Sequence, residues 1–280
     1  MKKLECVVVC INYSDFLAHT LPFNKKHFNK MVVVTDTKDI NTQKLCEKWN
    51  VQCVVSDEMY VTDSAIPNKG VAINLGLNQL DRDGWVVSMD ADIWLPDETR
   101  SILSKQYLDE TKLYGIDRMM CNSYEDWINF LFSTKTIYEG WIYQHIDHFK
   151  MGTRLIQYHG DLYWPIGFFQ LWNPSVSNIT TYPIADSLPG YDRVDVQMLK
   201  QFPASKRELL ASLVCIHLAS QDHSQGQNWR GRGTKQFGPS IYVKKYKRSI
   251  WSYIKYVKTY ILKKSYEFGL FFSKISFKNN

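Results

Sequence analysis

Short apolar runs rich in β-branched residues recur through the first ninety residues, and they constrain the fold more than any other feature. The runs span residues 6–11, 31–35, 51–55 and 85–89. Each has the length and composition of a strand that is buried on both faces. The stretches between them predict helices, one capped by Asn41 or Thr42 and running to Trp49, and another over residues 69–80. Strands that alternate with helices predict an α/β fold with a mostly parallel central sheet and right-handed crossovers.

Polar residues directly follow three of these runs. Asn12 and Tyr13 come after the first run, Asp36 after the second, and Asp90 and Asp92 after the fourth. In open α/β sheets, ligands bind in the crevice outside the carboxyl ends of the strands. We therefore expect these side chains to converge on one binding crevice.

Asp90 and Asp92 are the strongest candidates for a metal site in this crevice. Two carboxylates one residue apart at the end of a strand can both reach one hard cation. Mg²⁺ and Mn²⁺ prefer oxygen ligands and keep some coordination sites for substrate phosphates. The alternative is a solvated turn after a strand, where aspartate is common.

Three further segments precede this Asp-x-Asp motif in a fixed order. They are Ile-Asn-Tyr at 11–13, Val-Thr-Asp at 34–36 and Asn-Lys-Gly-Val-Ala-Ile-Asn-Leu-Gly at 68–76. In their order and spacing, the first hundred residues resemble the nucleotide-sugar-binding half of GT-A glycosyltransferases, the family-two type in particular. Ile73 stands where that family has an arginine, which makes Lys69 the natural cation for the donor diphosphate.

The resemblance implies a GT-A, Rossmann-like fold and an enzyme that transfers a sugar from a nucleotide-sugar donor, expected to be a UDP-sugar. It also implies Mn²⁺ or Mg²⁺ as the cofactor. The donor-binding residues that it implies are Asn12, Tyr13, Asp36, Lys69 and Asp90. Asp92 is then expected to bind the metal directly, whereas Asp90 contacts the donor ribose or reaches the metal through water.

His217 and two arginines extend the resemblance into the second half of the chain. His217 lies in an apolar run, like the strand-borne histidine that completes the metal site of many GT-A enzymes, and neutral imidazole suits Mn²⁺. Arg230 and Arg232 follow in a glycine-rich loop, where arginine side chains can clamp phosphates. The alternatives are a structural histidine and a solvated basic loop.

Asp192 and Asp195 are candidates for the general base that takes a proton from the acceptor hydroxyl if the enzyme inverts. They lie where the resembled family places its acidic catalytic residue, and we favour Asp195; the alternative is capping of a helix over residues 192–202. Gly167 and Phe168 are candidates for an acceptor wall, because glycine permits close approach and an aromatic face can stack on a sugar or base. The alternative for that segment is a core strand.

The expected domains are a catalytic domain (residues 1–240), made of a donor half (1–100) and an acceptor half (101–240), and a basic helical tail (241–280). Residues 97–165 show only helix and loop fragments. His145 and His148 within them resemble metal ligands, but their isolation favours a surface helix. The acceptor half is therefore less well defined by sequence than the donor half.

Positive charge is concentrated in the tail. Residues 241–280 carry ten Lys or Arg and a single acid, a net charge of +9, which leaves −3 for the rest of the chain. Ile250, Ile254, Val257 and Ile261 recur at helical spacing, so a basic amphipathic helix is predicted. Such a helix fits three partners: the catalytic domain itself, an anionic membrane surface, and the phosphates of DNA.

The partners correspond to two acceptor hypotheses. The favoured acceptor is the hydroxymethyl group of a modified pyrimidine, such as hydroxymethylcytosine, in phage-type DNA, where the base must be flipped out of the duplex. The alternative is a cell-surface glycan of the lipopolysaccharide or capsule type, extended at the inner membrane face. A third hypothesis, a non-enzymatic nucleotide- or glycan-binding relic, is opposed by the retained acidic and histidine residues.

The six cysteines include no Cys-x-x-Cys pair, and several lie in apolar runs, so free thiols in a reducing cytosol are expected. No run approaches the ~20 apolar residues that span a bilayer, and the first residues lack the apolar region of a signal peptide. We therefore expect a cytoplasmic protein, which is peripheral to the inner membrane if the tail binds lipid.

Overall fold

The computed structural model describes residues 3–60, 67–121, 124–132, 153–155, 158–159, 162–184 and 194–218. The chain divides into two units, Met1–Tyr242 and Val243–Asn280, and all described residues belong to the first. Among the described residues, no helix has both the length and the apolar content needed to cross a membrane. The basic tail lies outside the described residues, so its three possible partners stay predictions.

The first four strands form the parallel half of a nine-stranded sheet in this part of the chain. They are β1 (Leu4–Val9), β2 (Lys30–Thr35), β3 (Gln52–Val55) and β4 (Trp85–Asp90). β1 pairs in parallel with both β2 and β4, and β2 pairs with β3, which gives the order β3-β2-β1-β4. The predicted α/β class is confirmed, and the four strands that the apolar runs predicted are parallel to one another, although the sheet as a whole is mixed.

Five further strands complete the sheet. They are β5 (Ile93–Trp94), β6 (Leu113–Cys121), β7 (Thr153–Leu155), β10 (Phe169–Trp172) and β11 (Arg207–Leu218). β10 lies antiparallel between β4 and β6, β11 is parallel to β6, and β5 and β7 pair antiparallel with β11 and β6. A separate two-stranded sheet joins β8 (Tyr158–His159) to β9 (Leu162–Tyr163).

The prediction that residues 97–165 hold only helix and loop fragments is wrong, because this range contains β7, β8, β9 and the longest of them, β6. This nine-residue strand lies inside the sheet, between β10 and β11. Its sequence includes Gly115, Asp117 and Arg118, which interrupt the apolar pattern on which strand prediction depends. Asp117 and Arg118 are nevertheless buried. Pairing with neighbouring strands therefore outweighs the weak local preference of this segment.

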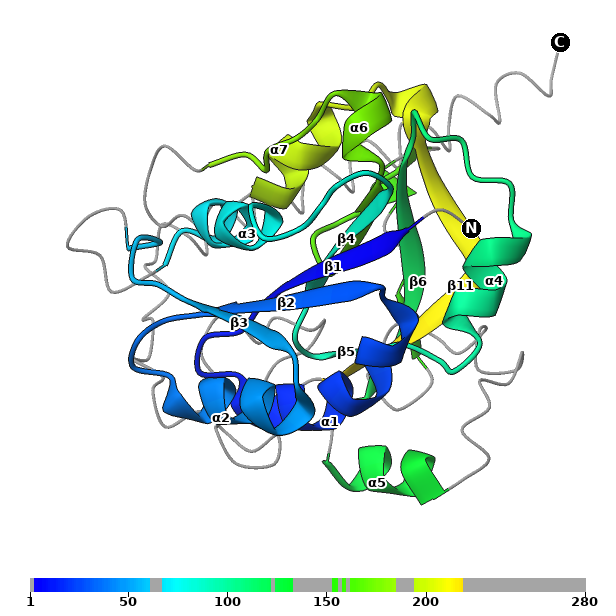
Figure 1. Ribbon diagram of the computed structural model, residues 1–280. Helices are drawn as coiled ribbons and strands as arrows, with labels where there is room; N and C mark the ends of the chain where they lie inside the picture. The colour runs from blue at the N-terminus through cyan, green and yellow to red at the C-terminus, as the bar shows by residue number, and fades with distance from the viewer. Residues whose placement is uncertain are drawn as a thin grey trace, which may run out of the picture. The chain divides into compact units, whose positions relative to one another are not determined.

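Helices cover both faces of the sheet (Figure 1). Their bounds are α1 (Ser14–Asn24), α2 (Ile40–Trp49), α3 (Lys69–Leu77), α4 (Thr99–Lys105), α5 (Tyr124–Phe132), α6 (Pro174–Ser177) and α7 (Val194–Lys200), with 3-10 turns η1 (Lys25–His27) and η3 (Ala204–Lys206). α1 and α2 pack on one face, and α3 and α7 pack on the other (Figure 1). Successive side chains of β1 point to opposite faces of the sheet. Cys6 and Val8 therefore face α1 and α2, whereas Val7 faces α3.

α3 is placed by a cap at its start and a glycine near its end. The Asn68 side chain accepts hydrogen bonds from backbone N–H groups of the first turn, so the helix begins at Lys69. A Cβ atom on Gly76 would lie 2.5 Å from the Val7 side chain, so glycine is required for α3 to approach β1 this closely. Lys69 is thereby held at the helix start, above the sheet.

α2 begins at a different cap from the two that the sequence suggested. Asp39 is the N-cap residue, and its carboxylate accepts hydrogen bonds from the N–H (3.1 Å) and hydroxyl (2.7 Å) of Thr42. The same carboxylate accepts the N–H of Asn12 at 2.7 Å. This tertiary bond to the loop after β1 favours Asp39 over Asn41 and Thr42, the two caps that local sequence suggested.

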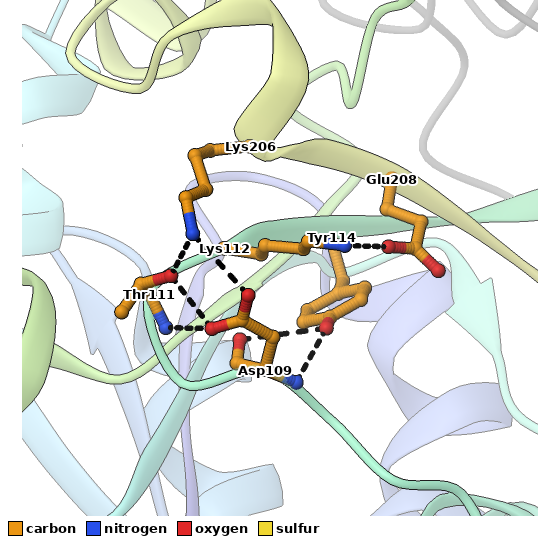
Figure 2. Close-up of polar contacts among 6 residues, drawn as sticks. All are labelled: Asp109, Thr111, Lys112, Tyr114, Lys206 and Glu208. Atoms are coloured by element: carbon orange, nitrogen blue, oxygen red, sulfur yellow. Dashed lines mark hydrogen bonds and ion pairs between the residues drawn. The ribbon is translucent and has the colours of Figure 1, made fainter.

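Six polar side chains, here called the polar clasp, join the start of β6 to the start of β11 (Figure 2). They are Asp109, Thr111, Lys112, Tyr114, Lys206 and Glu208. Lys206 Nζ lies 3.3 Å from an Asp109 carboxylate oxygen, and Lys112 Nζ lies 2.6 Å from a Glu208 carboxylate oxygen. β6 and β11 pair in parallel, so their carboxyl ends lie side by side. By joining the two strands at their starts, the clasp supports this register.

Candidate active site

The carboxyl ends of β1, β2 and β4 lie level with one another. Val9, the last residue of β1, pairs with both Val34 of β2 and Asp90 of β4. The polar residues that follow these strands therefore gather at one edge of the sheet, as the sequence predicted. Residues from α3, β10, β11 and α7 join them there, and together they form the candidate site.

Lys69 and Asp90 form an ion pair at this edge. Lys69 Nζ donates to Asp90 Oδ1 at 2.5 Å and lies 3.5 Å from the backbone oxygen of Gly167. Both side chains are only partly exposed. Burial by itself lowers the pKa of Lys69, but the carboxylates of Asp90, Asp195 and Asp92 outweigh it, so the net shift is upward. Lys69 is therefore a positive charge aimed at the end of β4.

Asp92 and His217 form a second, more deeply buried pair. His217 Nε2 lies 3.3 Å from Asp92 Oδ2, and the two side chains are almost entirely buried. Strand pairing places them together, because His217 of β11 pairs with Ile93 of β5. The backbone N–H of Leu218 also donates to the backbone oxygen of Asp92 at 2.9 Å. The predicted proximity of His217 to the Asp-x-Asp motif is thus present in the structure.

Arg118 belongs to the site although sequence analysis did not select it. Its side chain is 4% exposed, and its Nη1 lies 2.9 Å from His217 Nδ1. Burial lowers its pKa, and the carboxylates of Asp90 and Asp92 oppose that shift. A single arginine among the apolar residues of a strand was the signal available in the sequence, but recognising it required the strand to be predicted first.

Phe168 is enclosed by this cluster and does not form an open acceptor wall. The guanidinium carbon of Arg118 lies 4.6 Å from the centre of the Phe168 ring, and the His217 ring stacks on it at 6.1 Å with an interplanar angle of 24°. The ring is 4% exposed. The predicted stacking of a sugar or base on Phe168 is therefore corrected, since core packing already covers its faces.

Gly167 and Asp195 are in direct contact in the folded chain. The backbone N–H of Gly167 donates to Asp195 Oδ2 at 3.0 Å, and the N–H of Val196 donates to Asp195 Oδ1 at 2.9 Å. A Cβ atom on Gly167 would lie 2.7 Å from the Asp195 Cβ, so only glycine permits this approach. The charge of Asp195 also raises the pKa of Lys69. The predicted base and the predicted acceptor segment thus lie beside the Lys69–Asp90 pair.

Asp36 and Asn12 shape the loops at the ends of β2 and β1. Asp36 is buried, and its carboxylate accepts hydrogen bonds from two backbone N–H groups and from the Tyr60 hydroxyl at 2.5 Å. Asn12 has a φ of 57°, in the left-handed region that asparagine tolerates. The backbone oxygen of Tyr13 accepts the first hydrogen bonds of α1. Binding of the sugar donor by these residues stays a prediction. A contact between Asp36 and the sugar donor would use carboxylate oxygens that already accept hydrogen bonds within the loop.

The chemistry of Asp92 and His217 fits a divalent cation. Carboxylate and imidazole are both ligands of Mn²⁺, and carboxylate suits Mg²⁺. The 3.3 Å between Asp92 Oδ2 and His217 Nε2 is close to the ~3.0 Å between adjacent ligands of an octahedral ion with bonds of ~2.1 Å. Within the described ranges, no group of three or more His, Cys, Asp or Glu side chains is arranged to hold a metal. Among the described residues, Asp92 and His217 would be two protein ligands, on the strength of their own proximity.

Some predicted site residues lie outside the described residues. They are Asp192, Arg230 and Arg232, together with the His145 to His148 segment. Their roles in base catalysis, phosphate binding and metal binding stay predictions.

No protein-family model matches the chain, and no curated protein matches it. Solved structures resemble part of it. The glucosyl-3-phosphoglycerate synthase of Mycobacterium tuberculosis, in complex with Mn²⁺, UDP-glucose and glycerol 3-phosphate, has a TM-score of 0.45 and 11% identity. That match covers 77% of this chain and 72% of the synthase.

Two further structures match shorter regions. The same synthase in complex with Mn²⁺, UDP and phosphoglyceric acid has a TM-score of 0.31 and 14% identity, over 41% of this chain and 43% of its own. The mannosyl-3-phosphoglycerate synthase of Rubrobacter xylanophilus has a TM-score of 0.35 and 14% identity, over 42% and 40%. Less than half of each of these two solved chains is matched. Likeness at these TM-scores carries no argument about the activity of this chain.

Proposed function

We propose that this chain is a GT-A type glycosyltransferase that moves a sugar from a nucleotide-sugar donor, a UDP-sugar, to a hydroxyl acceptor with Mn²⁺ or Mg²⁺ as cofactor. The observation that carries the proposal is the pairing of Lys69 with Asp90 and of His217 with Asp92 at the carboxyl ends of parallel strands. This combination of cation, carboxylates and imidazole suits a diphosphate and its metal. The order of sequence motifs in the first hundred residues supports the same activity.

The residues of the site have different roles in such a reaction. Asp92 and His217 would hold the metal, which supplies positive charge that stabilises the departing diphosphate. Lys69 provides a second positive charge at the start of α3. Asp195, placed near Lys69, is the candidate base for an acceptor hydroxyl, and each of its two oxygens also accepts one backbone N–H. Asp90 orients Lys69 and is available to the donor ribose.

For the acceptor, we propose the hydroxymethyl group of a modified pyrimidine in DNA. The support is compositional, because residues 241–280 carry a net charge of +9 that suits a phosphate backbone. A surface glycan assembled on an anionic membrane uses the same charge. Transfer to hydroxymethylcytosine-containing duplex DNA, set against transfer to a glycolipid in anionic vesicles, separates the two acceptors.

The activity is tested by incubating the full chain with UDP- and GDP-sugars, Mn²⁺ and each acceptor, and measuring nucleoside diphosphate release. Asp92→Asn is expected to lower turnover by about 100-fold or more, since one stabilising group at a reacting charge is removed. Glu47→Gln is the matched control, because Glu47 is an exposed carboxylate on α2 that belongs neither to the site nor to the polar clasp. The absence of release with every donor and either metal contradicts the proposal, as does full activity of Asp92→Asn.

A further inference from the structure

The hydrogen bond between Arg118 and His217 determines where the imidazole carries its proton. A guanidinium group has five N–H donors and no acceptor. His217 Nδ1, 2.9 Å from Arg118 Nη1, must therefore accept. A neutral imidazole whose Nδ1 accepts has its proton on Nε2. In this structure Nε2 is buried and lies 3.3 Å from Asp92 Oδ2 without forming a hydrogen bond to it.

This tautomer is the wrong one for a metal ligand. A ring nitrogen that bears a proton has no lone pair for a cation, so coordination through Nε2 requires the proton to be on Nδ1. Metal-binding histidines accordingly donate their other N–H to a carboxylate, a carbonyl or water. Here the group facing Nδ1 is a donor. With a proton on Nδ1, two N–H donors would face each other across 2.9 Å with no acceptor between them.

Arg118 is firmly placed to maintain this arrangement. It is 4% exposed, and its guanidinium carbon lies 4.6 Å from the centre of the Phe168 ring, which stacks on His217. Its backbone pairs with Cys215, two residues from His217 on the neighbouring strand. The guanidinium, the phenyl ring and the imidazole therefore form one packed unit next to Asp92.

We propose that Arg118 is a positioning residue that competes with the divalent metal for His217: the Arg118–His217 hydrogen bond and coordination through His217 Nε2 exclude each other. Metal binding then requires the guanidinium to release Nδ1, and the buried positive charge of Arg118 adds to the cost. The inference rests on the proposed function, since it takes Asp92 and His217 as metal ligands. It assigns the site two alternative states, one held by arginine and one held by metal.

Two variants separate this role from simple packing. Arg118→Met removes the donor and the charge but keeps a long apolar side chain against Phe168. Arg118→Gln keeps a polar side chain whose carbonyl oxygen can accept from Nδ1–H, which is the tautomer that a metal needs. Arg207→Met is the matched control, because Arg207 lies on β11 at the end far from His217 and donates to the backbone oxygen of Phe202.

The tautomer is measured first, by the ¹⁵N chemical shifts of the His217 ring in the metal-free protein. The wild-type chain is expected to show the proton on Nε2, and Arg118→Gln is expected to move it to Nδ1. Mn²⁺ binding is then measured by calorimetry and electron paramagnetic resonance. Both Arg118 variants are expected to bind Mn²⁺ about 10-fold more tightly than wild type, and Arg207→Met is expected to match wild type.

A wild-type proton on Nδ1 overturns the inference, and so does equal or weaker Mn²⁺ binding by Arg118→Gln. If Arg118→Met does not fold, Arg118→Gln alone decides. Tighter Mn²⁺ binding by the Arg118 variants without nucleotide-sugar turnover by any form of the chain contradicts the proposed function but leaves the competition intact. The two failures are therefore distinguishable.

Discussion

At the scale of single residues, the candidate site is a group of opposite charges that are held close together at one edge of the sheet. Lys69 faces Asp90, and His217 lies between Asp92 and Arg118. Buried or half-buried charges are tolerated only when they are paired, because desolvation of an isolated charge costs several kcal/mol. The ion pair with Lys69 stabilises the half-buried Asp90, and the buried Asp92 lies against the His217 imidazole. When a donor diphosphate and its metal bind, their contacts with these side chains would replace some of the contacts within this group.

Lys69→Met tests whether the lysine serves the donor. The change leaves Asp90 beside Asp92 without its cation, and it removes a charge-assisted hydrogen bond to a phosphate. UDP binding in the presence of Mn²⁺ is expected to weaken by about 10-fold or more in calorimetry. Lys44→Met, on the exposed side of α2, is the control and should bind UDP like wild type. Unchanged UDP affinity of Lys69→Met assigns the lysine a purely structural role.

At the scale of elements, β6 and β11 matter most, because together they carry Arg118 and His217. Their parallel pairing has an irregularity between Leu210 and Val214, and the residues beyond it are again in register up to Leu218. The polar clasp secures the other end of the pair (Figure 2). The alignment of Arg118 with His217 is therefore a property of two whole strands, and the clasp is one of the contacts that stabilise it.

Asp109→Asn tests the contribution of the clasp. Hydrogen bonds from the side chain and backbone of Thr111, and then the contact with Lys206, lower the pKa of Asp109 to about 2. A pKa below the ordinary value of 3.8 means that the carboxylate stabilises the fold above about pH 4 and loses this effect as the pH falls toward 2. In urea unfolding, the variant is expected to have a lower midpoint than wild type at pH 5, and the difference should shrink at pH 2.5.

Glu58→Gln, an exposed carboxylate outside the clasp, serves as the comparison for this experiment. It should show no such pH-dependent difference from wild type. If the midpoint difference between Asp109→Asn and wild type is equal at both pH values, the effect of the substitution comes from packing and not from the charge.

At the scale of the whole molecule, the site is assembled from parts of the chain that are far apart. Lys69 and Gly167 are 98 residues apart, and Arg118 and His217 are 99 residues apart. β10 joins the two halves, because it pairs with β4 of the parallel half and with β6 of the second half. Global stability of this α/β unit is therefore a condition for the site.

His27 makes this global stability sensitive to pH. It is 1% exposed, and burial, together with the Lys26 charge, lowers its pKa to about 4. Below pH 6.5 the unfolded chain takes up a proton that the folded chain resists, so stability is lost as the pH falls from 6.5 toward 4. The free energy of unfolding is expected to fall by about 2 kcal/mol between pH 8 and pH 5 from this residue.

Urea unfolding of wild type and His27→Gln at pH 8 and pH 5 measures this contribution. The variant should lose less stability than wild type between the two pH values. Burial also lowers the pKa of His19, which gives a loss of the same sign in both proteins, so the difference between them isolates His27. Equal losses in the two proteins contradict the assignment.

The sequence by itself determined the parallel half of the fold and the edge at which its polar residues meet. Short β-branched runs carry their strand preference locally, and the rule that parallel strands gather their carboxyl ends then brings Asp36 and Asp90 to one edge. The helix at Lys69 was predictable for the same reason, because its cap lies in the preceding residue. Each of these inferences depends on neighbours within a few positions along the chain.

Only the tertiary structure decided what surrounds His217. β6 contains two charged residues that local patterns exclude from a strand, and their burial is possible only because partners come from elsewhere in the chain. The covering of Phe168 by Arg118 depends likewise on strand pairings between distant segments. Local sequence carries no signal for such contacts, since the partners are 50 residues apart for Arg118 and Phe168 and 99 residues apart for Arg118 and His217. The contact between Arg118 and His217, from which we infer the tautomer and the competition for metal, therefore exists only in the folded chain.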